Sequence, residues 1–310
     1  MQAIEQYTRR FALDTIDRRL QILFPLKEIQ GIEHISNLRK EYLQHQMPII
    51  FAFNHLGLEV VRVYETALQI VGDDSKLIVP VSEHYLHYKN FPIYALAVSL
   101  AQRILTSQFP PVIQSYRIRD DTLSDEHLNE LSKRSQELGI STIRSIVKGF
   151  QNGACVIIAP EGHRSHDYTL LPAEVGSGLL IRTLNKLKKQ NKIPDARIVP
   201  IAFEPFDRSG LFNRQHYKMT IGEPVDPQNI LDLATELAQD YGINNGKPNP
   251  ALASHALMLK IAELMSPERR GVYDVEDQRF EQVLLGELKL GINNAGEVDV
   301  FNYQASRMGE

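Results

Sequence analysis

The residues that decide the fold form two apolar runs, Pro48–Phe53 (PIIFAF) and Ala154–Ala159 (ACVIIA). Each run has the length and β-branched content of a strand, and each breaks off into polar residues. The polar segments are Asn54–Glu59 (NHLGLE) and Pro160–Ser165 (PEGHRS). Because sites in α/β sheets are built from loops at the carboxyl ends of strands, we predict that the two segments are halves of one site.

Strand-like and helix-like segments alternate along the rest of the chain. Further strands are expected at residues 76–81, 112–113, 197–203 and 217–222. Helices are expected at 35–46, from Gly57 onward, at 92–105, 122–137, 141–151 and 175–190, and in most of the remainder. This alternation predicts an α/β fold with a mixed, largely parallel central sheet flanked by helices.

The predicted organisation has three parts. They are an N-terminal amphipathic helix at residues 1–30, a core at 31–225, and a mostly helical extension at 226–310 that packs on the core. Apolar residues between Ile4 and Leu23 share one face of the first part, and arginines lie elsewhere on it. This helix either packs on the core or lies on an anionic membrane with its arginines toward the head groups.

Composition is that of an ordinary soluble globular protein. Of 310 residues, 43% are hydrophobic and 23% are charged, and the net charge of −4 gives no basic field that would favour nucleic acid. The single Cys155 excludes internal disulfides. No apolar stretch reaches the roughly 20 residues of a membrane-spanning helix, and no segment resembles a signal peptide. We therefore expect a cytoplasmic protein, either free or peripheral on a membrane surface.

His55 and Glu59 are the candidate catalytic pair. If the chain turns helical directly after the strand, residues four apart share a face and the two side chains meet. A carboxylate bound to one imidazole nitrogen fixes the tautomer and leaves the other nitrogen to accept a proton from a hydroxyl. The alternative is a surface histidine beside a helix-start glutamate, which is the more frequent case for an isolated His-x-x-x-Glu.

The second polar segment offers groups that bind an anion. Arg164 stays charged and can bind a phosphate bidentately, Gly162 lets the backbone approach a ligand, and Glu161 adds a polar anchor. Arg117 and Arg119 form a further basic point, either a salt-bridged turn with the neighbouring aspartates or a second clamp on the same anion. Taken alone, each segment is equally well explained as a solvated loop.

No metal site is predicted. His84 and His87 have a metal-like spacing, but no further ligand set accompanies them. Four lysines lie at or just beyond the end of the helix expected at 175–190: Lys186, Lys188, Lys189 and Lys192. Such a group is usually a solvated face that complements the helix dipole, and contact with a membrane surface is the alternative.

The order of these segments resembles that of the glycerolipid acyltransferase superfamily, which includes the lysophosphatidic acid and glycerol-3-phosphate acyltransferases. The family's first motif is Asn-His, four residues and Asp; Asn54-His55 match it, with Val60 in place of the Asp and Glu59 one residue earlier. The third motif is Phe-Pro-Glu-Gly-Thr-Arg-Ser, and Ala159–Ser165 match five of seven positions, with His163 in place of Thr. Further family-like segments lie at 31–35, 151–158, 198–202 and 221–224, so the resemblance covers roughly residues 31–225.

The resemblance implies an acyltransferase-like catalytic core at 31–225. Such a core moves a fatty acyl group from a thioester, acyl-CoA or acyl carrier protein, to a hydroxyl of a lysophospholipid or related acceptor. His55 would then be the general base and Glu59 its orienting group, and no metal or redox cofactor is implied.

In the same reading, Arg164 with Arg117 or Arg119 holds the acceptor phosphate, and Glu161 holds the loop or an acceptor hydroxyl. Two other interpretations stay open. One is an acyltransferase for a non-phospholipid alcohol, and the other is a non-catalytic lipid-binding relative whose base is misaligned.

Overall fold

The computed structural model describes residues 25–56, 59–72, 76–82, 107–113, 125–165, 167–209, 214–246, 248–285, 288–292 and 298–302. Residues 1–24 of the helix expected at 1–30, the helix expected at 92–105, and Arg117 and Arg119 lie outside these residues. Leu26–Gln30 is a strand, β1, so the helix predicted at residues 1–30 is wrong over its last five residues. These residues pair with another strand instead of continuing a helix.

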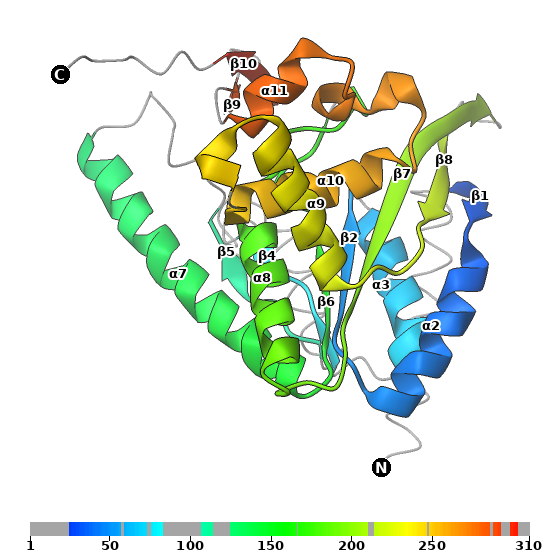
Figure 1. Cartoon of the computed structure of the whole chain (residues 1–310). Coiled ribbons are helices and arrows are strands. Elements are labelled where there is room, and N and C mark those ends of the chain that lie inside the picture. Colours follow the sequence, from blue (N-terminus) through cyan, green and yellow to red (C-terminus); the bar gives the residue numbers. More distant parts are fainter. Residues whose placement is uncertain are drawn as a thin grey trace.

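A six-stranded sheet forms the centre of the protein, in the order β1-β8-β7-β2-β6-β3 (Figure 1). The strands after β1 are β2 (Ile49–Phe53), β3 (Leu77–Ile78), β6 (Cys155–Ile158), β7 (Arg197–Ser209) and β8 (Arg214–Ile221). All neighbouring pairs are parallel except β7 with β8. The predicted fold class, a mixed and largely parallel sheet flanked by helices, is confirmed.

Helices cover both faces of this sheet. One face packs on α2 (Ile32–His45) and α3 (Glu59–Val71), and the other packs on α8 (Val175–Lys189), α9 (Pro227–Asp240) and α10 (Pro250–Ala262). Successive residues of β2 alternate between the two: Ile50 and Ala52 join the second cluster, and Ile49, Phe51 and Phe53 the first. Burial on both faces explains why the strand is continuously apolar.

Two predicted boundaries are wrong. The helices expected at 122–137 and 141–151 are one helix, α7 (Asp125–Gln151), because Gly139 is tolerated inside a long helix with open space around it. The strand expected at 76–81 is split into β3 and β4 (Val81–Ser82), with Pro80 between them. Proline has no N–H to donate, so it interrupts a ladder.

The remaining elements are short. They are β5 (Pro111–Val112), which pairs with β4, the 3-10 turns η2 (Ile243–Gly246), η3 (Pro267–Arg269) and η4 (Gly271–Tyr273), α11 (Gln278–Leu284), and the antiparallel strands β9 (Leu288–Ile292) and β10 (Val298–Asn302). The segment after residue 225 therefore contains a hairpin as well as helices. Helix α10 lies against α8 and contributes to the same buried cluster.

The α8–α10 contact requires a glycine. A Cβ on Gly178 would lie 1.8 Å from the carbonyl oxygen of Pro250. The Ser254 hydroxyl accepts hydrogen bonds from the Gly178 N–H at 2.8 Å and from the Ser177 hydroxyl at 2.9 Å. The two helices therefore meet at backbone distance, with polar groups satisfied across the contact.

We expect Gly178→Ala to lower the free energy of unfolding by roughly 1–3 kcal/mol, because backbone atoms of Pro250 must move. Gly176→Ala is the matched control: it lies in the same helix and its Cβ would have nothing within 4 Å. The control should be neutral or stabilising by up to about 1 kcal/mol. Urea unfolding of both variants measures the difference, and equal stabilities would contradict the backbone contact.

Candidate active site

Asn54 joins the end of β2 to β7. Its side chain is buried at 1% exposure, its Nδ2 donates to the Phe203 carbonyl at 2.9 Å, and its Oδ1 accepts from the Phe203 N–H at 2.7 Å. The side-chain amide thus takes the place that a backbone peptide group would occupy in the ladder. This fixes the chain where the strand ends and the next residue, His55, begins the loop.

The two polar segments predicted from the sequence meet at the backbone of His55. Its N–H donates to Oε2 of Glu161 at 2.6 Å, and its carbonyl accepts from the Ser165 N–H at 3.0 Å. Both backbone groups of His55 are therefore bound by the loop that follows β6. The position of His55 depends on a segment more than a hundred residues away.

Glu161 connects three segments and is fully buried. Its second oxygen, Oε1, accepts from the Leu171 N–H at 2.8 Å. Burial raises the pKa of the Glu161 carboxyl to about 8, opposed in part by the amides of His55 and Leu171. Amides bind both oxygens, so this carboxyl group holds the loop, which is one of the two roles predicted for Glu161. Contact with an acceptor hydroxyl, the other role, stays a prediction.

The Glu59 carboxylate contacts the imidazole of His55. Glu59 is the first residue of α3 and is fully buried, and its Oε1 lies at Nδ1 of His55. The predicted contact between the two side chains is present, although α3 begins at Glu59 and His55 precedes the helix. Since Nδ1 is engaged by a carboxylate, Nε2 is the nitrogen left to accept a proton. The Phe53 ring lies edge-on to the imidazole, with centroids 6.2 Å apart.

His163 brings a second imidazole to the loop. It is 4% exposed, and burial, together with the nearby His55, lowers its pKa to about 4. His163 is therefore uncharged near neutral pH and adds no positive charge beside His55. The sequence marked this position only as a departure from the Thr of the acyltransferase motif.

The other predicted anion-binding residues have mixed outcomes. Gly162 has φ +74°, and a Cβ there would lie 2.9 Å from Cγ of Glu174, so the turn itself requires glycine. Arg164 lies two residues after Gly162 in the same loop and is partly buried. Arg117 and Arg119 lie outside the described residues, and their place relative to Arg164 stays a prediction.

The sequence analysis did not identify the hydrogen bonds that Asp167 makes just after this loop. Oδ1 of Asp167 accepts hydrogen bonds from the Ser165 hydroxyl at 2.8 Å and from the Thr169 N–H and hydroxyl at 3.1 and 2.8 Å. Between them, Tyr168 adopts a left-handed φ of +64°. The Asp-x-Thr spacing, typical of an Asx turn, was the signal available in the sequence.

The part of the chain that the structure describes holds no group of three or more His, Cys, Asp or Glu arranged for a metal ion. His84 and His87 lie outside it. Among the same residues, none of the helices combines the length and apolarity needed to cross a membrane.

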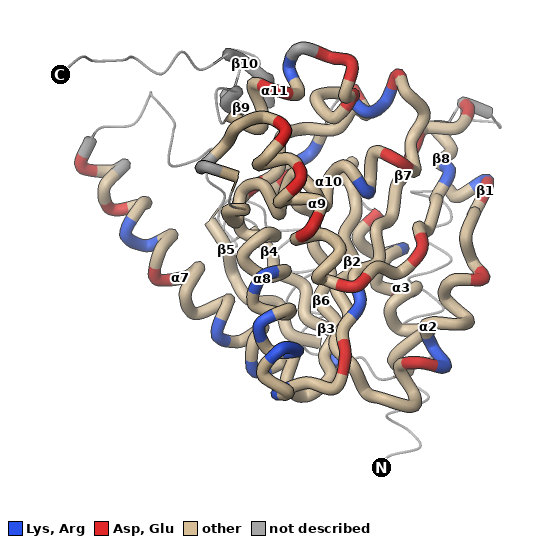
Figure 2. Tube along the Cα trace, in the orientation of Figure 1, with Lys and Arg blue, Asp and Glu red and all other residues tan. Residues whose placement is uncertain are grey.

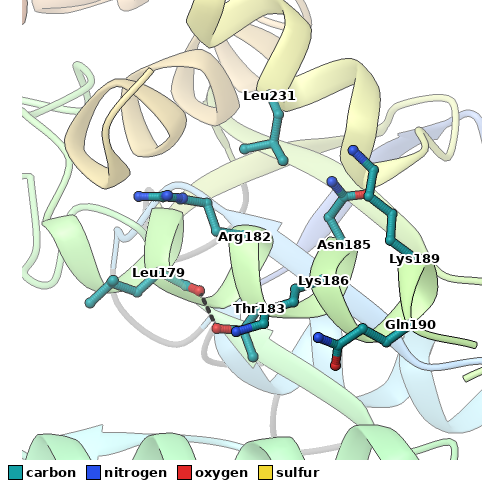
Figure 3. A pocket seen from close by; sticks show the side chains of 8 residues that line it. All are labelled: Leu179, Arg182, Thr183, Asn185, Lys186, Lys189, Gln190 and Leu231. Carbon is teal, nitrogen blue, oxygen red and sulfur yellow. Dashed lines mark hydrogen bonds between the residues drawn. The ribbon is translucent and has the colours of Figure 1, made fainter. Parts of the chain in front are cut away.

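A hollow of about 510 Å³ lies between α8 and α9, away from the site residues (Figure 3). Its lining comprises Leu179, Arg182, Thr183, Asn185, Lys186, Lys189, Gln190 and Leu231. It lies at the end of α8, where basic residues occupy the last turn (Figure 2). Lys188 in the same turn is bound by Asp195 and Asp226. None of the predicted site residues lines this hollow.

Comparison with known proteins finds a distant likeness among solved structures only. The sequence matches no protein-family model and no curated protein. Among solved structures, the chain is similar to the 1-acyl-sn-glycerophosphate (LPA) acyltransferase PlsC from Thermotoga maritima, with 16% identity over 71% of this chain and 71% of that chain. The TM-score of 0.37 is too low for functional residues to be carried from one structure to the other.

Glu161 predicts a pH-dependent stability. Its carboxyl is protonated in the folded state up to about pH 8, but an unfolded chain releases the proton near the usual value of 4.5. Between these values the unfolded state binds fewer protons, so the free energy of unfolding falls as pH rises.

Relative to Glu161→Gln, which cannot titrate, the wild-type protein should therefore lose stability across pH 4.5–8, by as much as about 1.4 kcal/mol per pH unit. Urea unfolding of both proteins across this window measures the effect. A constant difference in stability between them would contradict the raised pKa of Glu161.

Proposed function

We propose that this protein is an O-acyltransferase that moves an acyl group from a thioester to a hydroxyl, with His55 as the general base. The observation that carries the proposal is the contact of the buried Glu59 carboxylate with Nδ1 of His55 at the carboxyl end of β2. A histidine oriented in this way accepts a proton at its other nitrogen and is stabilised as an imidazolium by the carboxylate. The order of the acyltransferase-like motifs in the sequence supports acyl transfer as the reaction class.

In the proposed reaction, Nε2 of His55 takes the proton of the acceptor hydroxyl as its oxygen attacks the thioester carbonyl. A carbon–oxygen bond forms, the carbon–sulfur bond breaks, and the departing thiolate takes the proton from the imidazolium. The acyl group passes directly between the two substrates, so no acyl-enzyme forms. Cys155 plays no part, because burial raises the pKa of its thiol well above its usual value.

Arg164 is proposed to bind the acceptor. It lies in the loop whose backbone binds His55, so a phosphate on its guanidinium would bring an adjacent hydroxyl toward Nε2. Acyl-CoA or acyl carrier protein is the proposed donor, and a lysophospholipid or related alcohol, in solution or at a membrane surface, is the proposed acceptor.

A panel of acceptors with one acyl thioester separates the alternatives. Lysophosphatidic acid, glycerol 3-phosphate and a phosphate-free long-chain alcohol are each incubated with enzyme, and thiol release is followed. Turnover with phosphorylated acceptors supports the proposal, and turnover with the alcohol alone favours the non-phospholipid reading. Lipid binding with no release of thiol from the donor in the presence of any acceptor would identify a non-catalytic lipid-binding protein.

We expect His55→Ala to lower turnover by 10²-fold or more, since a general base contributes roughly 10²–10⁴-fold. His45→Ala is the control, because His45 is exposed at the end of α2 and distant from the loop. Circular dichroism verifies that both variants are folded. Turnover of His55→Ala within about tenfold of wild type would rule out the mechanism.

We expect Arg164→Ala to raise KM for a phosphorylated acceptor by roughly tenfold or more, because it removes a charge-assisted hydrogen bond. KM for the thioester donor should change little. Arg182→Ala, an exposed arginine of α8, serves as the control. A rise in donor KM instead would show that Arg164 binds the other substrate.

A further inference from the structure

The buried hydroxyl of Tyr273 has two hydrogen-bond partners near the loop at residues 160–165, here called the site loop. Tyr273 belongs to η4 and is 1% exposed. Its oxygen accepts from the Ala173 N–H at 2.8 Å and lies 2.8 Å from Nδ1 of His255 on α10. The hydroxyl oxygen accepts from Ala173, and in the Nε2–H tautomer of His255 the hydroxyl proton is donated to Nδ1.

The surroundings of His255 agree with this direction of donation. His255 is buried, and burial lowers its pKa to about 4, so its imidazole is uncharged and, in the Nε2–H tautomer, offers a lone pair at Nδ1. Burial also raises the pKa of Tyr273 well above its usual value, so the hydroxyl keeps its proton. Tyr273 therefore holds the Ala173 amide with a fully satisfied, buried hydroxyl.

The segment Leu170–Glu174, here called the strap, lies between Tyr273 and the site loop. Its Leu171 N–H donates to Oε1 of Glu161 at 2.8 Å, and its Glu174 N–H donates to the Pro160 carbonyl at 2.8 Å. On its other side, the Leu170 N–H donates to the Arg269 carbonyl at 3.2 Å. The amides of Leu171 and Glu174 therefore bind the strap to the site loop. The amides of Leu170 and Ala173 bind it to residues 269–273, here called the C-terminal segment.

The C-terminal segment approaches the strap at backbone distance. Gly271 has φ +54°, and a Cβ there would lie 2.4 Å from the Leu170 carbonyl oxygen. A guanidinium nitrogen of Arg269 donates to the Asp167 carbonyl at 2.8 Å, just before the strap. These contacts come from residues beyond 225, outside the stretch that resembles the acyltransferases.

We propose that Tyr273 is a positioning residue for His55, acting through the strap and Glu161. Two hydrogen bonds to the Glu161 carboxyl group connect the strap to His55: Leu171 N–H donates to Oε1, and His55 N–H donates to Oε2. Loss of the Ala173 hydrogen bond lets the strap move, so the carboxyl group loses its fixed orientation and the His55 N–H loses its partner. The expected effect on kcat rests on the proposed function. The expected effect on the hydrogen bonds of the strap and His55 rests on geometry alone.

Tyr273→Phe removes only the hydroxyl and leaves the ring in place. We expect kcat to fall about tenfold, because a buried amide and a buried imidazole nitrogen lose their partner, while both KM values stay within about twofold. Tyr241→Phe is the matched control: Tyr241 packs on Phe280 in the same aromatic group, and its hydroxyl has no hydrogen bond to any described residue. Equal kcat for the two variants would overturn the proposal.

A double-mutant cycle separates positioning from general loosening. If Tyr273 acts through Glu161, adding Tyr273→Phe to Glu161→Gln should change kcat by less than about twofold. If the two effects on kcat multiply, Tyr273 acts by another route and the proposal fails. His255→Leu removes the acceptor of the same hydroxyl and is used in this cycle if Tyr273→Phe does not fold.

Amide hydrogen exchange tests the connection without any assay of activity. In Tyr273→Phe, exchange should become faster at Ala173, Leu171 and also His55, whose N–H depends on Glu161. Faster exchange at Ala173 alone, with His55 unchanged, would overturn the proposal. A protein that transfers no acyl group but shows the three linked changes would refute the proposed function and leave the positioning contact standing.

Discussion

The buried carboxyl group of Glu161 is the group on which the rest of the site depends. A polar group removed from water is costly unless hydrogen bonds replace its solvation. Here one oxygen binds the amide of His55 and the other binds the amide of Leu171. The two loops therefore depend on each other: without Glu161 the His55 amide loses this partner, and without the two amides the carboxyl group has no compensation for its burial.

The sheet brings these loops together by register. In the parallel pairs of β2, Ile49 lies opposite Cys155 of β6 and opposite Arg197 of β7. Strands β2 and β6 therefore end at the same edge, while β7 continues to Ser209. Asn54 extends the pairing of β2 with β7 by binding Phe203 through its side chain. Burial on both faces prevents a slip of register, because a one-residue shift would exchange the two apolar faces of β2.

The chemistry of the site follows from which groups are charged. Glu59 is buried against Nδ1 of His55, and the neighbouring His163 is kept uncharged by its own burial. The only guanidinium among residues 159–165 is that of Arg164, which we propose as the partner of an anionic substrate group. Residues 269–273 bind the strap behind this loop through hydrogen bonds to Leu170 and Ala173.

Local sequence determined the features that depend on local geometry. The apolar runs of β2 and β6 and the start of α8 follow from strand length and helix period. The short separation of His55 and Glu59 in the sequence places their side chains within reach of each other. The joining of two polar segments at one sheet edge also followed, because parallel strands present their carboxyl ends together.

Only the tertiary structure decided what Glu161 binds, that α7 is one helix, and that Tyr273 and His255 support the strap. The partners of these buried groups lie as far as 106 residues away in the chain. A buried polar group takes whichever donor or acceptor packing brings within reach, and no local pattern in the sequence records that choice.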